Sequence, residues 1–190
     1  MDESIERMSE RERMLAGQPY RCDCDELESM RAKARRLTEE LNSGARPADA
    51  VLRELFARFG EGGRIEPPFR CDYGCHTSIG KNFYANYDCI VLDCAKVHIG
   101  DNVMLGPRVT ICTATHPICA EERRSALEMA LPVEIDDGVW IGAGAIVNPG
   151  VSIGARSVIG SGSVVTKDIP ADVVAAGNPC RVIRHIEENA

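Results

Sequence analysis

The segment "TICTATHPIC", residues 110–119, holds the side chain of this sequence best suited to acid–base chemistry, His116. An imidazole with an unperturbed pKa of about 6.5 is largely neutral at pH 7, as a general base must be. Pro117 stiffens the backbone beside it, and the small residues before it leave the ring accessible. These features make His116 a candidate general base.

His116 lies where a regular repeat of the sequence breaks off. Units of six residues place a short strand and a turn in register, so that one aliphatic position per unit points inward and stacks coil upon coil. Glycine often follows that position, because a sharp corner needs backbone angles closed to other residues. The pattern predicts a mainly β fold, a parallel β-helix of hexapeptide repeats. Its inward column comprises Ile99, Leu105, Ile111, Ile135, Ile141, Val147, Ile153, Ile159 and Val165.

Two interruptions of the repeat stand out. The inward column also runs through Ile79, Ala85 and Val91, then slips by two residues before Ile99. Farther on, the stretch "CAEERRSALEMA" is too charged to form a stacked coil, although the repeats after it remain in phase. We therefore expect residues 112–132 to protrude as a loop with His116 at its root. A long loop inside a regular scaffold is usually functional.

The first third of the chain predicts helices. We expect a helical region over residues 1–60 and a β-helix domain over 61–190, with a C-terminal tail at 170–190. Within the helical region, Asp25 is the predicted N-cap of a helix that ends at Gly44, and Pro47 opens a second helix. A shorter helix is predicted across "SIERMSERERMLAG". All three are too short to be stable alone, so they should pack on the domain after them.

Composition excludes several classes of protein. The formal net charge of −7 argues against a nucleic-acid partner, which would need a basic footprint. The charged N-terminus lacks the apolar core of a secretory signal, and no apolar run approaches the length that spans a bilayer. A cytoplasmic protein without a membrane partner is expected. The nine cysteines are scattered, with no CxxC pair, and are interpreted as small reduced hydrophobes rather than metal ligands.

The repeat, taken together with further motifs, resembles the maltose/galactoside O-acetyltransferase family. Those motifs are "NFYANYDCIVLD", "TATHP", "GVWIGAGAIVNPGVSIG", "VVTKDIP" and "AAGNPCRVIR", and "ERMLAGQPYRCDCDELE" resembles the helical start of the family. The resemblance covers nearly the whole chain. It implies a left-handed coil, a homotrimer with active sites between neighbouring subunits, acetyl-CoA as co-substrate, and a sugar acceptor similar to maltose or glucose. It also implies direct acetyl transfer that requires no metal.

The resemblance assigns roles to individual residues. His116 would deprotonate the acceptor hydroxyl with Asn86 beside it, and the backbone N–H of Ala143 would stabilise the oxyanion. No cysteine or serine is expected beside His116 as a nucleophile. Cys22 and Cys94 stand where the galactoside branch has acidic acceptor contacts, which favours a maltose-like acceptor. The acceptor-binding candidates are Asp72, Tyr84, Asn86, Asp93, Glu128 and Met129. The cofactor-binding candidates are Trp140, Ala143, Ser161, Thr166, Lys167, Arg181 and Arg184.

Three alternatives share the repeat. A zinc hydratase of the γ-carbonic-anhydrase type needs three converging histidines, for which His76, His98 and His116 are available, but none are close together in sequence. An acetyltransferase for serine or a xenobiotic would use the same scaffold. A catalytically inactive β-helix with a structural role would have lost the motif around His116, whereas "TATHP" and the motifs of the cofactor arm occur together in this sequence. The residues favour acetyl transfer.

Overall fold

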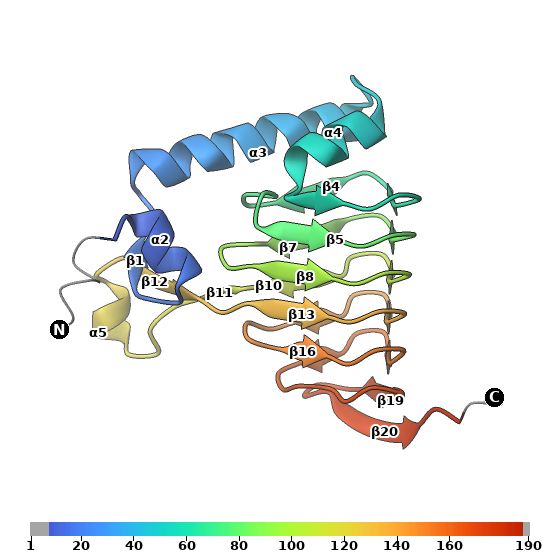
Figure 1. Cartoon of the computed structure of the whole chain (residues 1–190). Helices are drawn as coiled ribbons and strands as arrows, with labels where there is room; N and C mark the ends of the chain where they lie inside the picture. Colours follow the sequence, from blue (N-terminus) through green and yellow to red (C-terminus); the bar gives the residue numbers. More distant parts are fainter. Residues whose placement is uncertain (1–7, 188–190) are drawn as a thin grey trace.

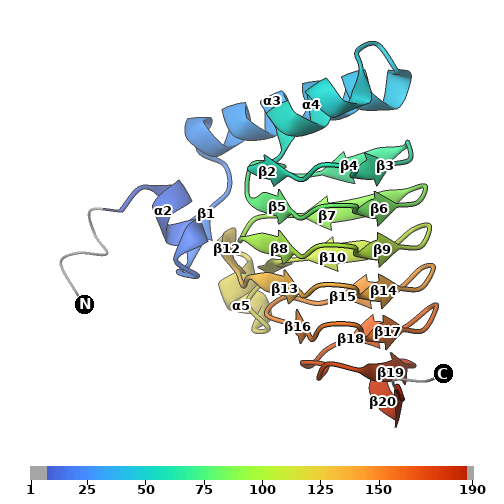
Figure 2. The same ribbon diagram turned by 45° about the vertical axis from the view of Figure 1, so that its right-hand side comes forward.

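The computed structural model describes residues 8–187, and most of them coil into a three-sided parallel β-helix (Figure 1, Figure 2). Each coil contributes one strand to each side, and we name the sides faces I, II and III in the order in which the chain visits them. Face I consists of β2 (Arg58–Phe59), β5 (Thr77–Ile79), β8 (Val97–Ile99), β13 (Val133–Ile135) and β16 (Ser152–Ile153).

The other two faces obey the same rule. Face II ends in an antiparallel hairpin, and it consists of β3 (Arg64–Ile65), β6 (Tyr84–Ala85), β9 (Met104–Leu105), β14 (Trp140–Ile141), β17 (Val158–Ile159), β19 (Val173–Ala176) and β20 (Arg181–His185). Face III consists of β4 (Phe69–Cys71), β7 (Cys89–Leu92), β10 (Thr110–Cys112), β15 (Ile146–Val147) and β18 (Val164–Val165). Corner II–III joins faces II and III, and corner III–I joins face III to face I of the next coil.

The predicted inward column forms the core of the β-helix. Ile99 is 1% exposed and pairs with Ile79 on one side and Ile135 on the other. Every predicted member of the column from Ile99 to Val165 is buried. The coils approach so closely at the corners that a Cβ on Gly142 would lie 2.6 Å from the backbone nitrogen of Ser161. The prediction of a mainly β parallel β-helix is confirmed.

The slip of two residues has a structural counterpart at corner III–I. Ile79 pairs with Ile99, so the early coils are two residues longer than the later coils, in which Ile135 pairs with Ile153. The registers of faces II and III continue without a shift. The additional residues therefore widen corner III–I, which contains Asp72 and Asp93.

The insertion protrudes from the same corner (Figure 1). It contains β11 (Ala114–Thr115), the short helix α5 (Ala120–Arg123) and β12 (Leu127–Ala130). Strand β12 pairs antiparallel with β11 and with β1 (Tyr20–Arg21), which brings the N-terminal segment to the loop. The chain thus leaves the coil after β10, which ends at Cys112, and returns at β13, and the loop between them is held by a small sheet of its own.

Helices cover one end of the β-helix. These are α3 (Asp25–Ser43) and α4 (Ala48–Leu55), whose buried residues join the main core, whereas α2 (Glu10–Leu15) lies at the side beside β1 and β12. The C-cap of α3 is Gly44 in the left-handed conformation, as predicted. The predicted N-cap is wrong. Cys24 occupies that position, and Asp25 is the first residue of the helix. The part of the predicted first helix before residue 8 lies outside the described residues.

The three faces differ in their outward side chains. Face I presents polar residues such as Ser78, His98 and Glu134. Face II presents Met104 and Trp140, which are 48% and 50% exposed. Among residues 8–187, no helix has the length and hydrophobicity needed to cross a membrane.

Replacing Ile99 with alanine should destabilise the protein. The variant removes a buried side chain from the middle of the inward column and leaves a cavity, which costs about 2–5 kcal/mol of unfolding free energy. Urea denaturation of wild type and Ile99→Ala measures the loss. The control is His98→Ala, at the exposed neighbouring position of β8, and equal losses in both variants would contradict the assigned core.

Candidate active site

His116 lines a pocket of about 640 Å³ formed by the protruding loop. Its side chain is exposed, as the sequence predicted, and Leu127 and Met129 line the same pocket. Arg123 in α5 donates hydrogen bonds to the carbonyls of Pro117 and Ile118, at 3.0 and 3.1 Å. These bonds fix the turn after His116. The loop therefore presents the imidazole in a largely apolar surrounding.

Cys119 bears on the expectation that no nucleophile lies beside His116. It lines the same pocket as His116, so a thiol shares the pocket of the predicted base. Cys119 is the N-cap residue of α5, and the backbone N–H groups of Glu122 and Glu121 lower the pKa of its thiol. In the sequence, Cys119 follows His116 by three residues in "HPIC", which was the only sign that the two side chains share a pocket. The sequence does not show that the chain turns after His116 and brings Cys119 to the same pocket.

The predicted pair Glu128 and Met129 is split between two environments. Adjacent residues of a strand point to opposite faces, and in β12 Met129 faces the pocket of His116. Glu128 instead accepts a hydrogen bond of 2.8 Å from the hydroxyl of Tyr20, which is fully buried. Burial is the largest of the causes that raise the pKa of the Tyr20 hydroxyl. The hydrogen bond to Glu128 raises this pKa further. Tyr20 therefore ties β1 to the loop, a role the sequence analysis missed.

Asp93 does not fit its predicted role as an acceptor ligand. Its side chain is fully buried and accepts hydrogen bonds from Tyr73 N (2.8 Å), His76 N (3.3 Å) and Thr77 Oγ1 (3.1 Å). Burial raises the pKa of its carboxyl to about 6. Tyr73 and His76 belong to the widened corner III–I of the preceding coil, and Thr77 begins β5 directly after it. Asp93 therefore holds that corner in shape and has no access to a small molecule.

Asp72 lies in the same corner but remains half-buried. Burial raises the pKa of its carboxyl, and the negative charge of Glu128 acts in the same direction. The thiol of Cys94 donates to Asp72 Oδ2 at 3.6 Å. Asp72, Cys94 and Glu128 thus converge between corner III–I and the loop, as a cluster that could accept hydrogen bonds from a polyhydroxylated compound.

Asn86 lies at a different corner from His116. It comes after β6 at corner II–III, where its Oδ1 accepts a hydrogen bond of 2.8 Å from Tyr87 N. Asn86 occupies the position that Gly106 and Gly142 hold in the next coils. The left-handed residue of this corner is Asp88, with a φ of 61°, rather than Asn86. Within one chain, all of face III separates Asn86 from the loop of His116.

The predicted oxyanion donor also lies at corner II–III. In the described part of the chain, the N–H of Ala143 has no hydrogen-bond acceptor, whereas Gly142 N donates to Ile159 O (2.7 Å) and Gly144 N to Pro107 O (2.8 Å). Ser161 lies one coil later on the same edge. Tyr84 and Trp140 project from the neighbouring face II, where Met104 lies between them.

The cationic candidates lie near the C-terminal end of the β-helix. Thr166 and Lys167 are exposed and come after β18 at corner III–I. Arg181 and Arg184 are exposed on β20, which extends face II. The predicted cofactor residues are therefore distributed, within one chain, over both edges of face III and over face II.

The three candidate zinc ligands do not converge. His76 is buried in corner III–I and His98 is exposed on face I, and both line a pocket that does not include His116. His116 lies in the loop instead. Within residues 8–187 of one chain, the three histidines therefore do not share a site.

Comparison with known proteins gives the family. Residues 13–60 match the maltose acetyltransferase hexapeptide capping motif, and residues 132–167 match the bacterial transferase hexapeptide of six repeats. The galactoside O-acetyltransferase of Escherichia coli (strain K12) is 43% identical over 181 residues, which cover 93% of this chain and 89% of that protein. The chain belongs to the maltose/galactoside O-acetyltransferase family.

Solved structures of this acetyltransferase family superimpose on most of the chain. A maltose O-acetyltransferase from Clostridium difficile 630 superimposes with a TM-score of 0.92 at 49% identity, covering 95% of this chain and 99% of that one. A galactoside acetyltransferase in complex with coenzyme A superimposes with a TM-score of 0.91 at 42% identity, covering 95% and 92%. The predicted family membership is confirmed.

Removing the hydroxyl of Tyr20 should loosen the loop of this acetyltransferase. Tyr20→Phe keeps the buried ring but leaves Glu128 without its partner, so we expect several-fold faster tryptic cleavage after Arg123 and Arg124, measured by mass spectrometry. Tyr87→Phe, at an exposed tyrosine of corner II–III, is the control. An unchanged cleavage rate in Tyr20→Phe would show that the bond does not hold the loop.

Proposed function

We propose that the protein transfers the acetyl group of acetyl-CoA to a hydroxyl of a sugar similar to maltose or glucose. The observation that carries this proposal is the near full-length similarity to a galactoside acetyltransferase bound to coenzyme A and to a maltose O-acetyltransferase. The cluster of Asp72, Cys94 and Glu128 beside the loop suits a polyhydroxylated acceptor, because carboxylates accept hydrogen bonds from hydroxyl groups.

In the proposed reaction, His116 acts as general base. One imidazole nitrogen takes the proton of the acceptor hydroxyl, whose oxygen attacks the thioester carbonyl of acetyl-CoA. The N–H of Ala143 donates to the oxyanion as it forms, since this donor is otherwise unpaired in residues 8–187. Collapse of the tetrahedral intermediate breaks the carbon–sulfur bond, and the imidazolium returns the proton to the thiolate of coenzyme A.

His116 and Ala143 must be supplied by different subunits for this reaction. In one chain they lie on opposite edges of face III, His116 on the loop from corner III–I and Ala143 at corner II–III with Asn86. A cyclic homotrimer would place corner III–I of one subunit against corner II–III of the next. The exposed Met104 and Trp140 of face II then border the same contact.

Coenzyme A carries several phosphate charges, so an acidic protein needs local cations to bind it. We propose that Lys167, Arg181 and Arg184 supply them, with Thr166 and Ser161 along the cofactor arm and Trp140 beside it. All six are exposed. Charge-assisted hydrogen bonds of this kind contribute about 1.5–3 kcal/mol each, so a few are sufficient to fix the nucleotide.

Replacing His116 with alanine should abolish acetyl transfer. We expect kcat/KM to fall by roughly 10²–10⁴-fold for a maltose or glucose acceptor because the acceptor hydroxyl loses its base. Release of free thiol from acetyl-CoA measures the rate. His98→Ala, on face I, is the control. Full activity of His116→Ala would refute the proposed base.

Cys119 decides between direct transfer and an acetyl-cysteine intermediate. Under direct transfer, Cys119→Ala should keep kcat within about threefold of wild type, because the thiol forms no bond to the acetyl group. Mass spectrometry of enzyme mixed with acetyl-CoA without acceptor should show no acetylation of Cys119. A variant as inactive as His116→Ala, together with an acetylated Cys119 in the wild type, would establish the covalent route.

Mixing two inactive variants tests whether the site is shared. His116→Ala and Asn86→Ala each spoil one side of the proposed contact. When the two variants are unfolded together and refolded, their subunits should mix at random. About a quarter of the contacts then join an intact His116 from one subunit to an intact Asn86 from the next, so we expect about a quarter of wild-type activity. Each variant refolded alone is the control. No recovery in the mixture, with wild type recovering after the same treatment, would place both residues in one subunit's site.

A further inference from the structure

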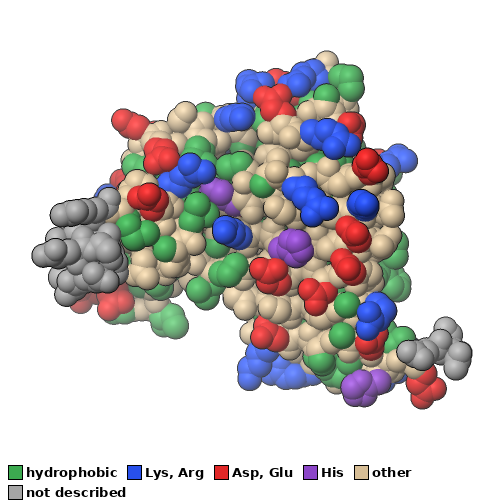
Figure 3. All heavy atoms as spheres, in the orientation of Figure 1, with side chains coloured by type: hydrophobic (Ala, Val, Ile, Leu, Met, Phe, Trp, Pro, Cys, Tyr) green, Lys and Arg blue, Asp and Glu red, His purple; other side chains and the backbone are tan. Residues whose placement is uncertain are grey.

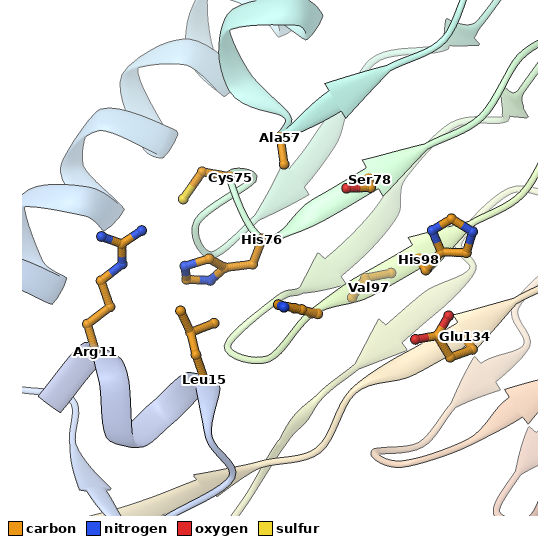
Figure 4. A pocket seen from close by; sticks show the side chains of 10 residues that line it. Arg11, Leu15, Ala57, Cys75, His76, Ser78, Val97, His98 and Glu134 are labelled. Carbon is orange, nitrogen blue, oxygen red and sulfur yellow. The ribbon is translucent and has the colours of Figure 1, made fainter. Parts of the chain in front are cut away.

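A second pocket, of about 560 Å³, lies between α2 and the polar face I (Figure 4). Its polar lining includes Arg11 from α2, Cys75 and His76 from corner III–I, and Lys96. His98 and Glu134 continue the lining along face I. None of these residues is assigned to acetyl transfer, and the pocket shares no residue with that of His116.

His76 forms part of the pocket wall with an unused acceptor. Its side chain is 7% exposed, and its Nδ1 lies 2.8 Å from the backbone carbonyl of Asp93. A carbonyl only accepts, so Nδ1 carries the hydrogen and the neutral ring keeps a lone pair on Nε2. Burial lowers the pKa of His76, and the charge of Arg11 lowers it further. Among the described residues, this buried Nε2 has no hydrogen-bond partner.

Cations gather around His76 in a protein with a formal net charge of −7. The side chain of Arg11 rises from α2 on the side of the pocket where Cys75 and His76 lie (Figure 4), and within residues 8–187 its buried Nε lacks a hydrogen-bond partner. Its NH1 atom lies 3.7 Å from Glu26, a distant ion pair. Lys96 is exposed at the rim, and Figure 3 shows Lys and Arg side chains beside the histidines of this face.

We propose that this pocket binds a small phosphate monoester whose remainder carries hydroxyl groups. The oxygens of a singly protonated phosphate accept from Arg11 and Lys96, while its O–H donates to Nε2 of His76. An ionised carboxylate has no such donor. Ser78, His98 and Glu134 offer hydrogen-bonding groups for the hydroxylated remainder.

The position of α2 links this pocket to the loop of the acetyltransferase. Because Nε of Arg11 and Nε2 of His76 are both buried, a ligand reaches them only as α2 shifts against corner III–I. Helix α2 leads into β1, which pairs with β12 and carries Tyr20, the partner of Glu128. Binding of the phosphate monoester therefore fixes the segment that holds the loop.

Alkylation of the cysteines tests the site on the full chain. Cys75 lines this pocket and Cys119 lines that of His116, so each thiol reports on its own site. With glucose 6-phosphate as the probe, iodoacetamide should modify Cys75 several-fold more slowly, measured by peptide mapping, whereas Cys119, outside this pocket, should be protected less than Cys75. Glucose and glucuronate should protect neither thiol.

Variants separate recognition from loss of structure. Lys96→Gln and Arg11→Gln should each remove the protection of Cys75. Arg58→Gln, on face I outside the pocket, should keep it. Lack of protection in the wild type, equal protection by glucose, or protection that persists in both pocket variants would overturn the proposal. Because the readout involves no acetyl transfer, these outcomes are independent of the proposed reaction.

Discussion

The close stacking of aliphatic side chains along the axis of the β-helix is the constraint on which all other features of the fold depend. Each coil is too thin to bury its own inward residues, so Ile79, Ile99 and Ile135 exclude water only by lying on one another. This requirement sets the register of all three faces. It also requires a cap where the stack ends, and α3 and α4 provide one with Leu52 and Leu55.

Departures from that regularity create the places where chemistry can occur. A coil of minimal length has tight corners with no room for polar clusters. Two additional residues in the early coils widen corner III–I, and the space accommodates Asp72 and the buried carboxylate of Asp93. The larger insertion leaves at the same corner and presents His116. The regular coils thus act as a rigid support, and the irregular corner contains the candidate site.

A second, smaller core joins distant parts of the chain at this corner. Met14 and Tyr20 from the N-terminal segment pack with Tyr73 and Cys94 of the corner and with Ala130 of the loop. The hydrogen bond from Tyr20 to Glu128 crosses the same contact. The position of the loop therefore depends on the N-terminal segment, which explains physically how a helical start can matter to a site built on a β-helix.

The amino-acid sequence alone was sufficient to predict the β-helix, the protruding loop, the helix end at Gly44 and the exposure of His116, because inward and outward positions repeat at a fixed spacing and leave a visible pattern. It did not reveal that Asp93 is buried, that Glu128 and Met129 face opposite sides, or that Cys119 shares the pocket of His116. Those facts depend on contacts between segments far apart in sequence and on the direction of each turn, and they are set only when the chain folds.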